Sequence, residues 1–279
     1  MVLTLKQTAE RVKRGGVAYY QLPGFALPKA ILHAFSTRVG GVSRGVHGTL
    51  NLGFKTQDDP LRVRQNRDLF ARTIGIRTEQ FVHVEQVHGD EVIEAKAGDR
   101  GRCLNPGQYL GRADALVTRE PRLALMVQVA DCLPVLFHDP VRRAIGVAHA
   151  GWRGTVNHVA VKTLLHMGEV YGTNPSDVRV GFGPCIGPCC YEVGEDVYRE
   201  FAGVFPWVED VFRTGFAGNR MLDLAEANAR QLIDIGVKRE NLVYSGLCTV
   251  GKIGDFYSHR AEGSVERPTG RFAAVIMLV

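Results

Sequence analysis

The sequence contains no hydrophobic run long enough to cross a membrane and no dense run of charges of one sign. Its longest apolar run, LALMVQVA at residues 123–130, is far shorter than the roughly 20 residues of a transmembrane helix. Residues 1–20 lack the continuous apolar core of a signal peptide. Lysine and arginine are scattered and the formal net charge is only +5, which favours a solvated surface over a nucleic-acid-binding one. We therefore expect a cytoplasmic protein that binds neither membranes nor nucleic acid, with a charge that suits a small anionic substrate.

Cysteine is sparse and irregularly spaced, and the chain has no internal repeat and no linker rich in proline and serine. The cysteines do not form the regular framework of a small secreted fold, so free thiols in a reducing compartment are the simplest interpretation. In such a compartment a cysteine with a special role is more often a metal ligand or a nucleophile than half of a disulfide. The six cysteines are at positions 103, 132, 185, 189, 190 and 248.

Segments with strand and helix patterns alternate along the chain. Helical spacing of apolar residues predicts helices over 155–171 and 222–235, and the chain ends in a buried strand, RFAAVIMLV. Several predicted strands adjoin hairpin-like turns, which favours mixed sheets over purely parallel ones. We expect a single α/β domain. Its other strands, rich in Val, Ile and Phe, are predicted at 30–37, 81–89, 115–120, 123–132, 134–139 and 144–151.

Three of these apolar runs end in residues that commonly bind metals, namely His88, Cys132 and His149. If the three strand ends meet at one edge of a sheet, two imidazoles and one thiol converge. That set suits zinc, and three protein ligands leave a fourth position open, as in catalytic zinc sites. The same set also accepts copper. Nine histidines and six cysteines allow many such triples, so ordinary half-buried side chains remain the alternative interpretation.

The residues beside these candidates favour a functional site. Gly89 and Gly151 have no side chain, so the backbone can approach a bound group closely. Asp131 could orient a ligand imidazole or act as a general acid or base. The alternative interpretation of Asp131 is a turn-forming aspartate. Arg153, at a predicted helix start, could face an anion or form a surface salt bridge. Trp152 is interpreted as packing.

A second segment of anion-binding type is FSTRVGGVS at 35–43. Ser36 and Arg38 lie at a predicted strand end, before two glycines whose N–H groups can approach an oxyanion. An ordinary glycine turn is the alternative. FYSHR at 256–260 offers a weaker version of the same pattern.

GPCIGPCC at 183–190 looks like a metal-binding knuckle, and HVE at 83–85 matches half of the nucleobase-deaminase signature. Three residues separate Cys185 from Cys189, and HVE lies about a hundred residues upstream, so neither spacing fits. We interpret these cysteines as small buried hydrophobic residues.

Several motifs, in this order, resemble the YfiH/laccase-domain family, whose members are called polyphenol oxidase, purine nucleoside phosphorylase or peptidoglycan editing factor. The resemblance runs from about residue 25 to the end, which leaves 1–24 as an N-terminal extension of one domain over 1–279. It implies an α/β/β/α layered sandwich with mixed sheets. The sequence departs from the family pattern at Val129, where Thr is common, and at His259, where SYR is usual. The motifs are STRVGGVS, EQVHGD, ADCLPVLFHD, GVAHAGWRGT, GPCIGPCCYEV, CTVG and FYSHR…GR, the last of which ends at Arg271.

The resemblance implies a zinc ion held by His88, Cys132 and His149, and the donor set itself leaves copper as the alternative. The leading hypothesis is a purine nucleoside enzyme that cleaves adenosine, inosine and S-methyl-5′-thioadenosine with inorganic phosphate and also deaminates adenosine. The expected catalytic residues are these three ligands with Asp131. Substrate and phosphate are expected at Ser36, Arg38 and Arg153.

Three other functions compete with this hypothesis. A thiol-type amide hydrolase acting on a cell-wall precursor would use Cys132 as nucleophile, activated by a neighbouring histidine. A copper-dependent polyphenol oxidase is disfavoured because no His-x-His motif occurs in the sequence. A non-enzymatic binding protein is disfavoured because the unusual residues gather at strand ends, where a rigid sheet can display catalytic groups.

Overall fold

The computed structural model describes residues 9–25, 30–215, 218–263 and 268–279. Within them, strands form two six-stranded sheets and one three-stranded sheet. The first sheet is antiparallel except for β4, which runs parallel to β7. Its strands, in spatial order, are β1 (Glu10–Arg14), β2 (Val17–Gln21), β3 (Ile31–Ser36), β15 (Phe272–Leu278), β7 (Ala124–Val129) and β4 (Phe81–His83).

The second sheet is also mixed, with parallel pairs at both edges and antiparallel pairs between them. The prediction of an α/β fold with mixed sheets is therefore confirmed. The strands of this sheet, in order, are β14 (Leu242–Tyr244), β10 (Arg179–Phe182), β8 (Leu133–Asp139), β9 (Ala144–Ala150), β6 (Ala115–Thr118) and β5 (Val92–Glu94).

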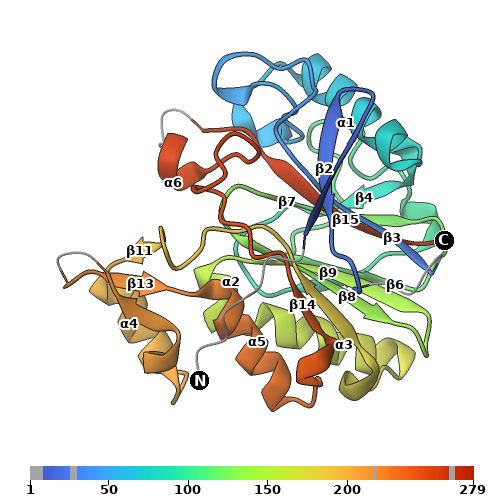
Figure 1. Ribbon diagram of the computed structural model, residues 1–279. Helices are drawn as coiled ribbons and strands as arrows, with labels where there is room; N and C mark the ends of the chain where they lie inside the picture. The colour runs from blue at the N-terminus through green and yellow to red at the C-terminus, as the bar shows by residue number, and fades with distance from the viewer. Residues whose placement is uncertain (1–8, 26–29, 216–217, 264–267) are drawn as a thin grey trace.

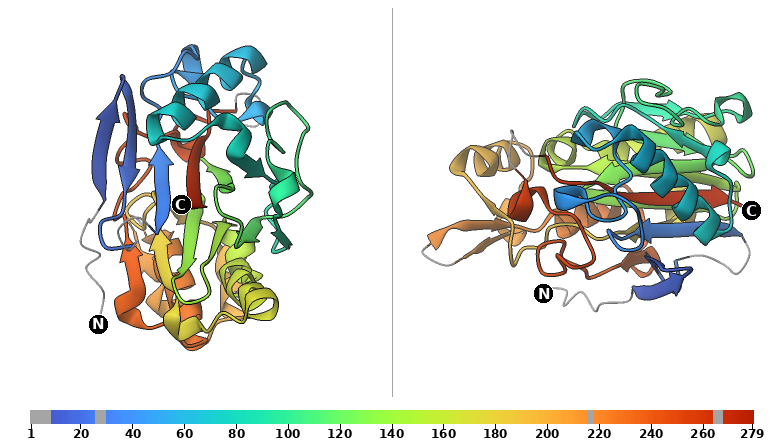
Figure 2. Two further views of the ribbon diagram at one scale, coloured as in Figure 1. Left: turned by 90° about the vertical axis from the view of Figure 1, so that its right-hand side faces the viewer. Right: turned by 90° about the horizontal axis from the view of Figure 1, so that it is seen from above.

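The two large sheets pack face to face, and helices cover their outer faces (Figures 1 and 2). Alternation along β7 shows why: Leu125 and Val127 point into the core between the sheets, while Ala124 and Met126 point outward to α1 (Pro60–Ile74). Successive side chains of a strand point to opposite faces of the sheet. A strand that is apolar on both faces is therefore buried only where another layer packs against each face of the sheet. The layers therefore follow the order α/β/β/α.

The outer face of the second sheet is covered by α3 (Val159–Tyr171) and α5 (Leu224–Asp234). The third sheet, β11 (Glu192–Val193), β13 (Arg220–Leu222) and β12 (Phe212–Thr214), lies to one side with α4 (Glu195–Ala202), at the left of Figure 1. No helix in the described residues is long and apolar enough to cross a membrane. The short helices are α2 (Trp152–Val156), α6 (His259–Glu262), η1 (Gly45–His47), η2 (Phe54–Thr56), η3 (Thr78–Gln80), η4 (Ala97–Asp99), η5 (Pro175–Asp177), η6 (Val208–Asp210) and η8 (Arg239–Asn241).

The predicted helix over 222–235 is confirmed by α5, whose N-cap, Asp223, accepts a hydrogen bond from the backbone N–H of Glu226 at 3.1 Å. The predicted continuous helix over 155–171 is wrong. The chain forms α2 and α3, separated at His158, which has a left-handed φ of 63°. The prediction failed because the helical spacing of apolar residues continues across the break. Such spacing gives no information about the backbone conformation of a single residue.

Two predicted strands are too long. The strand predicted over 81–89 ends at His83, and the backbone N–H groups of residues 87–89 bond to the carboxylate of Asp114 instead of to a strand. The strand predicted over 123–132 ends at Val129, and the following turn carries the chain from the first sheet to the second. The candidate ligands therefore meet at the junction of two sheets and not at one edge of a single sheet.

Candidate metal centre

His88, Cys132 and His149 come together in space. Their potential ligand atoms all lie within 4.8 Å of one another, and the two imidazole rings are 4.9 Å apart at an angle of 72°. His149 is buried on β9, Cys132 is half-buried in the turn between β7 and β8, and His88 is exposed. A tetrahedral zinc ion holds nitrogen and sulfur ligands roughly 3.4–3.8 Å apart, so small side-chain movements would complete the site. The donor set fits zinc, and it also fits copper.

Asp114, which directly precedes β6, orients this cluster. Its side chain is fully buried, and Oδ1 lies 2.7 Å from Nδ1 of His149. The same carboxylate accepts backbone N–H bonds from Val87, His88 and Gly89 at 3.1, 3.0 and 2.7 Å. Burial raises the pKa of Asp114, but its hydrogen bonds with His149 and with these N–H groups lower the pKa by a larger amount. The pKa therefore lies below its usual value. The carboxylate accepts a hydrogen bond from Nδ1 of His149 and so keeps the proton on that nitrogen. Nε2 is then available as a metal ligand.

Sequence reasoning missed Asp114. In the sequence analysis, Asp131 is a candidate to orient a ligand imidazole, to act as a general acid or base, or to form a turn. Asp131 does line the pocket beside Cys132, but its two carboxylate oxygens accept hydrogen bonds from Thr249 Oγ1 at 2.6 Å and from the Arg260 backbone N–H at 2.7 Å. The sequence signal for Asp114 was its position as a polar residue directly before an apolar strand. Because Asp114 and His149 are far apart in the sequence, the contact between them could not be predicted.

Cys132 lies in an electrostatic environment that favours the thiolate. Burial raises the pKa of its thiol, but the positive charge of His149 and hydrogen bonds from both histidines outweigh burial and lower the pKa to about 6. For His149, burial lowers the pKa, and the Cys132 thiolate and Asp114 raise it. A thiolate is both the form that binds a metal and the form that acts as a nucleophile.

Gly151 is required by close packing against the cluster. A Cβ atom at this position would lie 3.0 Å from Cys132 Sγ and 3.2 Å from His88 Cδ2. Both contacts are tighter than van der Waals separation allows without movement. The glycine therefore permits the chain that follows β9 to pass beside two of the three candidate ligands.

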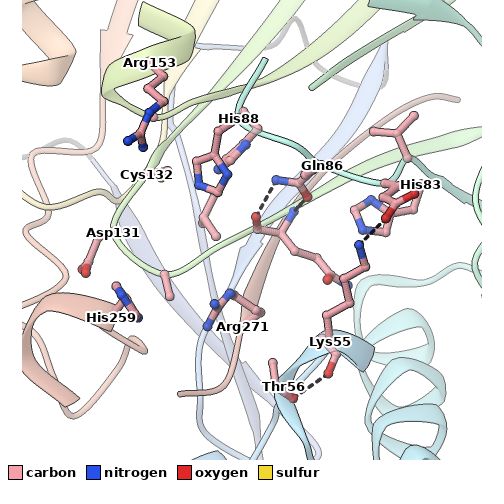
Figure 3. Close-up of a pocket in the computed structure, with 18 of the residues that line it drawn as sticks. Lys55, Thr56, His83, Gln86, His88, Asp131, Cys132, Arg153, His259 and Arg271 are labelled. Carbon is pink, nitrogen blue, oxygen red and sulfur yellow. Dashed lines mark hydrogen bonds and ion pairs between the residues drawn. The ribbon is translucent and has the colours of Figure 1, made fainter. Parts of the chain in front are cut away.

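The cluster opens into a cavity of about 550 Å³ (Figure 3). Arg153, His259 and Arg271 lie around the Cys132 end, and Lys55 and His83 lie at the other. The remaining walls include aromatic rings. The lining residues are Gly53, Lys55, Thr56, His83, Val84, Glu85, Gln86, His88, Tyr109, Gln128, Val129, Ala130, Asp131, Cys132, His149, Gly151, Trp152, Arg153, Tyr191, His259, Arg260 and Arg271.

Arg153 is an exposed arginine in this pocket whose charge is not neutralised by a carboxylate. Its guanidinium lies 4.3 Å from the centre of the Trp152 ring. Among the described residues it has no hydrogen-bond or ion-pair partner. A guanidinium stacked on an aromatic ring keeps its N–H donors available for an anion. The structure thus places Arg153 where the sequence analysis expected it, beside the candidate ligands.

Ser36 and Arg38, the other expected anion-binding residues, lie outside the cavity. Ser36 is fully buried, and its hydroxyl accepts the Ala273 N–H at 2.9 Å. The Arg38 guanidinium donates to Glu262 at 2.7 Å and stacks on Tyr257 at 4.5 Å. Both residues connect segments of the fold, and neither lines the pocket.

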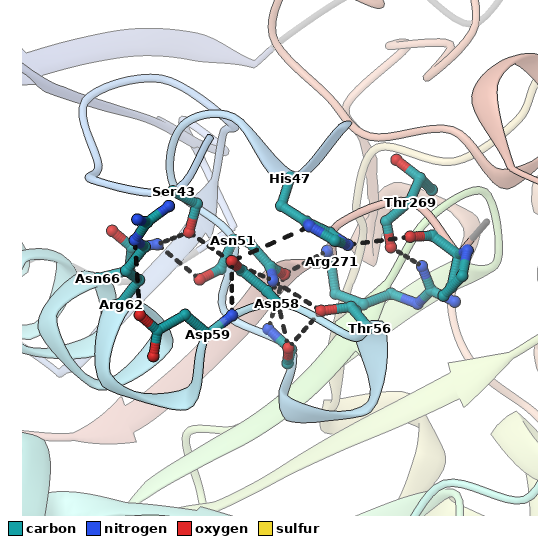
Figure 4. A network of polar contacts seen from close by, with 12 residues as sticks. Ser43, His47, Asn51, Thr56, Asp58, Asp59, Arg62, Asn66, Thr269 and Arg271 are labelled. Atoms are coloured by element: carbon teal, nitrogen blue, oxygen red, sulfur yellow. Dashed lines mark hydrogen bonds and ion pairs between the residues drawn. The ribbon is translucent and has the colours of Figure 1, made fainter. Parts of the chain in front are cut away.

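A polar network behind the cavity holds Arg271, a pocket residue that the sequence analysis noted only within a motif (Figure 4). The Arg271 backbone N–H donates to Asn51 Oδ1 at 2.9 Å. Asn51 donates in turn to Thr56 at 2.8 Å and to Asp58 at 3.0 Å, and Asp58 accepts from Ser43 at 2.6 Å. The network fastens the loop before α1 to the start of β15, and it fixes one cationic wall of the pocket.

His83 is a second pocket residue that the sequence analysis did not select for function. Its Nδ1 lies 3.0 Å from the carbonyl oxygen of Met126, so Nδ1 must carry the proton. Burial lowers the pKa of His83 to about 3. The imidazole is therefore neutral at physiological pH and contributes polarity without charge to the pocket.

The chain matches the family model described as multi-copper polyphenol oxidoreductase laccase over residues 32–279. A purine nucleoside phosphorylase of Deinococcus radiodurans is 40% identical over 265 residues, which are 94% of this chain and 94% of that protein. The purine nucleoside phosphorylase YfiH of Escherichia coli is 33% identical over 260 residues, covering 92% of this chain and 98% of that protein.

Solved structures show the same architecture. The hypothetical protein YfiH of Bacillus licheniformis superposes with a TM-score of 0.90 at 30% identity, covering 98% of this chain and all of that chain (100%). YlmD of Geobacillus stearothermophilus gives a TM-score of 0.89 at 32% identity, with 98% and 99% coverage. The likeness extends over both large sheets and their helices.

Proposed function

Since this chain belongs to the multi-copper polyphenol oxidoreductase laccase family, and since relatives that match 94% and 92% of it are named purine nucleoside phosphorylases, we propose that it is a zinc-dependent purine nucleoside phosphorylase. Its substrates are adenosine, inosine and S-methyl-5′-thioadenosine, which it converts with phosphate to the free base and ribose 1-phosphate or its methylthio analogue. Deamination of adenosine is a second activity. Membership of the family confirms the resemblance inferred from the motifs.

The observation that carries the proposal is the joint placement of the candidate metal ligands and Arg153 in one cavity. Phosphorolysis requires an anion held next to a sugar, and arginine binds phosphate with two parallel hydrogen bonds. Because Arg153 is not engaged by a carboxylate among the described residues, its donors are available for phosphate.

His88, Cys132 and His149 would hold a zinc ion, which would supply Lewis acidity. Asp114 keeps His149 in the ligating tautomer, Arg153 and Arg271 hold phosphate, and the rings of Trp152 and Tyr191 offer surfaces for a purine. In phosphorolysis a phosphate oxygen forms the bond to the anomeric carbon while the bond from that carbon to the purine nitrogen breaks. The electron pair of the broken bond leaves with the base.

An amide hydrolase is a second candidate, and the lowered pKa of Cys132 favours it. In that reaction the Cys132 thiolate attacks the carbonyl carbon, and His149 donates a proton to the departing amine. Treatment with a chelator should leave this activity intact, whereas iodoacetamide should abolish it. A metal-dependent phosphorylase responds to the chelator.

Copper-dependent oxidation is a third candidate because the family description names it and the nitrogen and sulfur donors accept copper. Electron paramagnetic resonance of the copper-loaded protein, together with a phenol oxidation assay, tests this activity directly. If the copper-loaded protein oxidises phenols and no metal supports nucleoside cleavage, the protein is an oxidase and not a phosphorylase.

The decisive experiment incubates the purified protein with adenosine, with and without phosphate, and separates the products by chromatography. Phosphorolysis yields adenine and ribose 1-phosphate only when phosphate is present, whereas deamination yields inosine without it. Elemental analysis of the same preparation and a His88→Ala variant connect the activity to the metal. If adenine, inosine and ribose 1-phosphate are all absent with zinc-loaded protein, the proposal is wrong.

A further inference from the structure

Three cysteines outside the candidate metal centre have their sulfur atoms close together near the molecular surface. The Sγ atoms of Cys189, Cys190 and Cys248 all lie within 4.8 Å of one another, and those of Cys189 and Cys190 are 3.4 Å apart. All three are free thiols, with Cys189 exposed and the other two half-buried. The interpretation of Cys189 as a buried hydrophobic residue is therefore wrong, whereas Cys185 is indeed buried.

Backbone hydrogen bonds hold the two loops that carry these cysteines together. The Cys185 N–H donates to the carbonyl of Leu247 at 3.2 Å, and the Thr249 N–H donates to the carbonyl of Cys185 at 3.0 Å. A turn follows, in which the Cys190 N–H donates to the carbonyl of Gly187 at 2.9 Å. The turn brings Cys189 and Cys190 back toward Cys248, so the three thiols are positioned by main-chain contacts.

Cys248 is surrounded by groups that stabilise negative charge on sulfur. Its Sγ accepts the N–H of Gly187 at 3.3 Å and the N–H of Gly251 at 3.5 Å. Cysteine binds metals as the thiolate, so one donor of the group is prepared for a cation.

We propose that Cys189, Cys190 and Cys248 form a second metal site, which binds a thiophilic ion such as zinc through three sulfur atoms. Three thiolates select soft or borderline ions over calcium and magnesium, which take oxygen ligands. A zinc ion at about 2.3 Å from each sulfur holds the sulfurs roughly 3.8 Å apart; two of the sulfurs are 3.4 Å apart, and all three lie within 4.8 Å of one another. The exposure of Cys189 leaves the outer coordination position open to solvent.

This site is connected to the wall of the cavity described above. Tyr191, which follows Cys190, lines that cavity. Thr249, which follows Cys248, donates to Asp131 at 2.6 Å, and the Ile186 N–H donates to the carbonyl of Asp131 at 2.8 Å. An ion held by the three cysteines would therefore stiffen the loops that position Tyr191 and Asp131.

Zinc binding to the reduced protein, measured under anaerobic conditions by competition with a chromophoric chelator, tests the proposal. The Cys189→Ser/Cys190→Ser double variant and the Cys248→Ser variant should each bind one equivalent of zinc less than the unaltered protein. Cys103→Ala, which changes a buried cysteine that belongs to neither cluster, should bind the full number. Circular dichroism checks that each variant is folded.

The result is independent of the proposed function. Cys132→Ala removes a ligand of the other centre, so a further loss of one equivalent in the Cys132→Ala/Cys248→Ser combination separates the two sites. Zinc should also slow alkylation of Cys189, Cys190 and Cys248 by iodoacetamide, as seen by mass spectrometry of peptides. An unchanged zinc stoichiometry in the Cys189→Ser/Cys190→Ser and Cys248→Ser variants, or unchanged alkylation of the three cysteines, would overturn the proposal. So would a disulfide among the three whose reduction yields no zinc binding.

Discussion

Asp114 and His149 form a buried pair in which Oδ1 of the carboxylate lies 2.7 Å from Nδ1 of the imidazole. The main chain joins them as well, because the His149 N–H donates to the Asp114 carbonyl at 2.7 Å. Asp114 thus fixes the tautomer of His149. By accepting three backbone N–H bonds it also holds the loop that carries His88. We expect the metal affinity of the protein to depend on Asp114 almost as strongly as on the ligands.

Replacing Asp114 with alanine should weaken zinc binding by about 10- to 100-fold, the usual effect of removing a group that orients a ligand. The free energy of unfolding should also fall by about 3 kcal/mol, because buried N–H groups lose their acceptor. Chelator competition and urea unfolding measure the two effects. The exposed Asp68 changed to alanine serves as the control, and an unaltered zinc Kd in folded Asp114→Ala would contradict the expectation.

Gly151→Ala should disturb the metal centre by steric contact alone. The new Cβ would lie 3.0 Å from Cys132 Sγ and 3.2 Å from His88 Cδ2, so both side chains must move. Overpacking of this kind costs about 1–3 kcal/mol, and zinc affinity should drop together with stability. Gly254→Ala is the matched control, because a Cβ there meets no atom within 4 Å. Equal zinc affinity in both variants would show that the centre tolerates the displacement.

Arg153→Met should raise the KM for phosphate and lower kcat/KM by roughly 10- to 100-fold, since a hydrogen bond to a charged group contributes about 1.5–3 kcal/mol. Methionine keeps much of the contact area with Trp152. Steady-state kinetics at varied phosphate and fixed nucleoside measure the effect. Arg64→Met, which alters an exposed arginine of α1, controls for the change in net charge. Deamination of adenosine, which uses no phosphate, should fall much less; equal losses in both reactions would assign Arg153 to the nucleoside.

Buried histidines should make the protein acid-sensitive, and His33 is the clearest case. Burial, aided by the charge of His138, lowers the pKa of His33 from 6.5 to about 4, and its Nε2 must stay unprotonated to accept the Leu22 N–H at 2.8 Å. Between these pH values the unfolded chain binds a proton that the folded chain does not. Stability should therefore fall as the pH decreases from 6.5 toward 4, by about 3 kcal/mol from this residue.

Urea unfolding at several pH values between 7 and 4 measures this dependence. His33→Gln retains a hydrogen-bond acceptor but cannot take up the proton, so its stability should change less with pH than that of the unaltered protein. Identical pH profiles for the two proteins would remove His33 as a cause.

Local sequence patterns predicted much of the fold and pointed to the candidate ligand triple. The apolar run over 123–132 predicted the strand that became β7, and polar residues after apolar runs singled out His88, Cys132 and His149 as candidate ligands. Each of these inferences depends on neighbours along the chain, because strand and helix periods are set by backbone geometry. Side-chain burial then follows from the same short-range pattern.

Only the tertiary structure decided which distant residues support those ligands. Asp114 is one of 29 acidic residues, and its role arises because β6 pairs with β9 and brings its carboxylate under His149. Arg38 resembled an anion-binding arginine in sequence, but packing of the chain gave it Glu262 as a partner. Cys248 joins Cys189 and Cys190 through contacts between two loops. Periodicity carries no information on such pairs, since their separation depends on how the sheets and loops pack together.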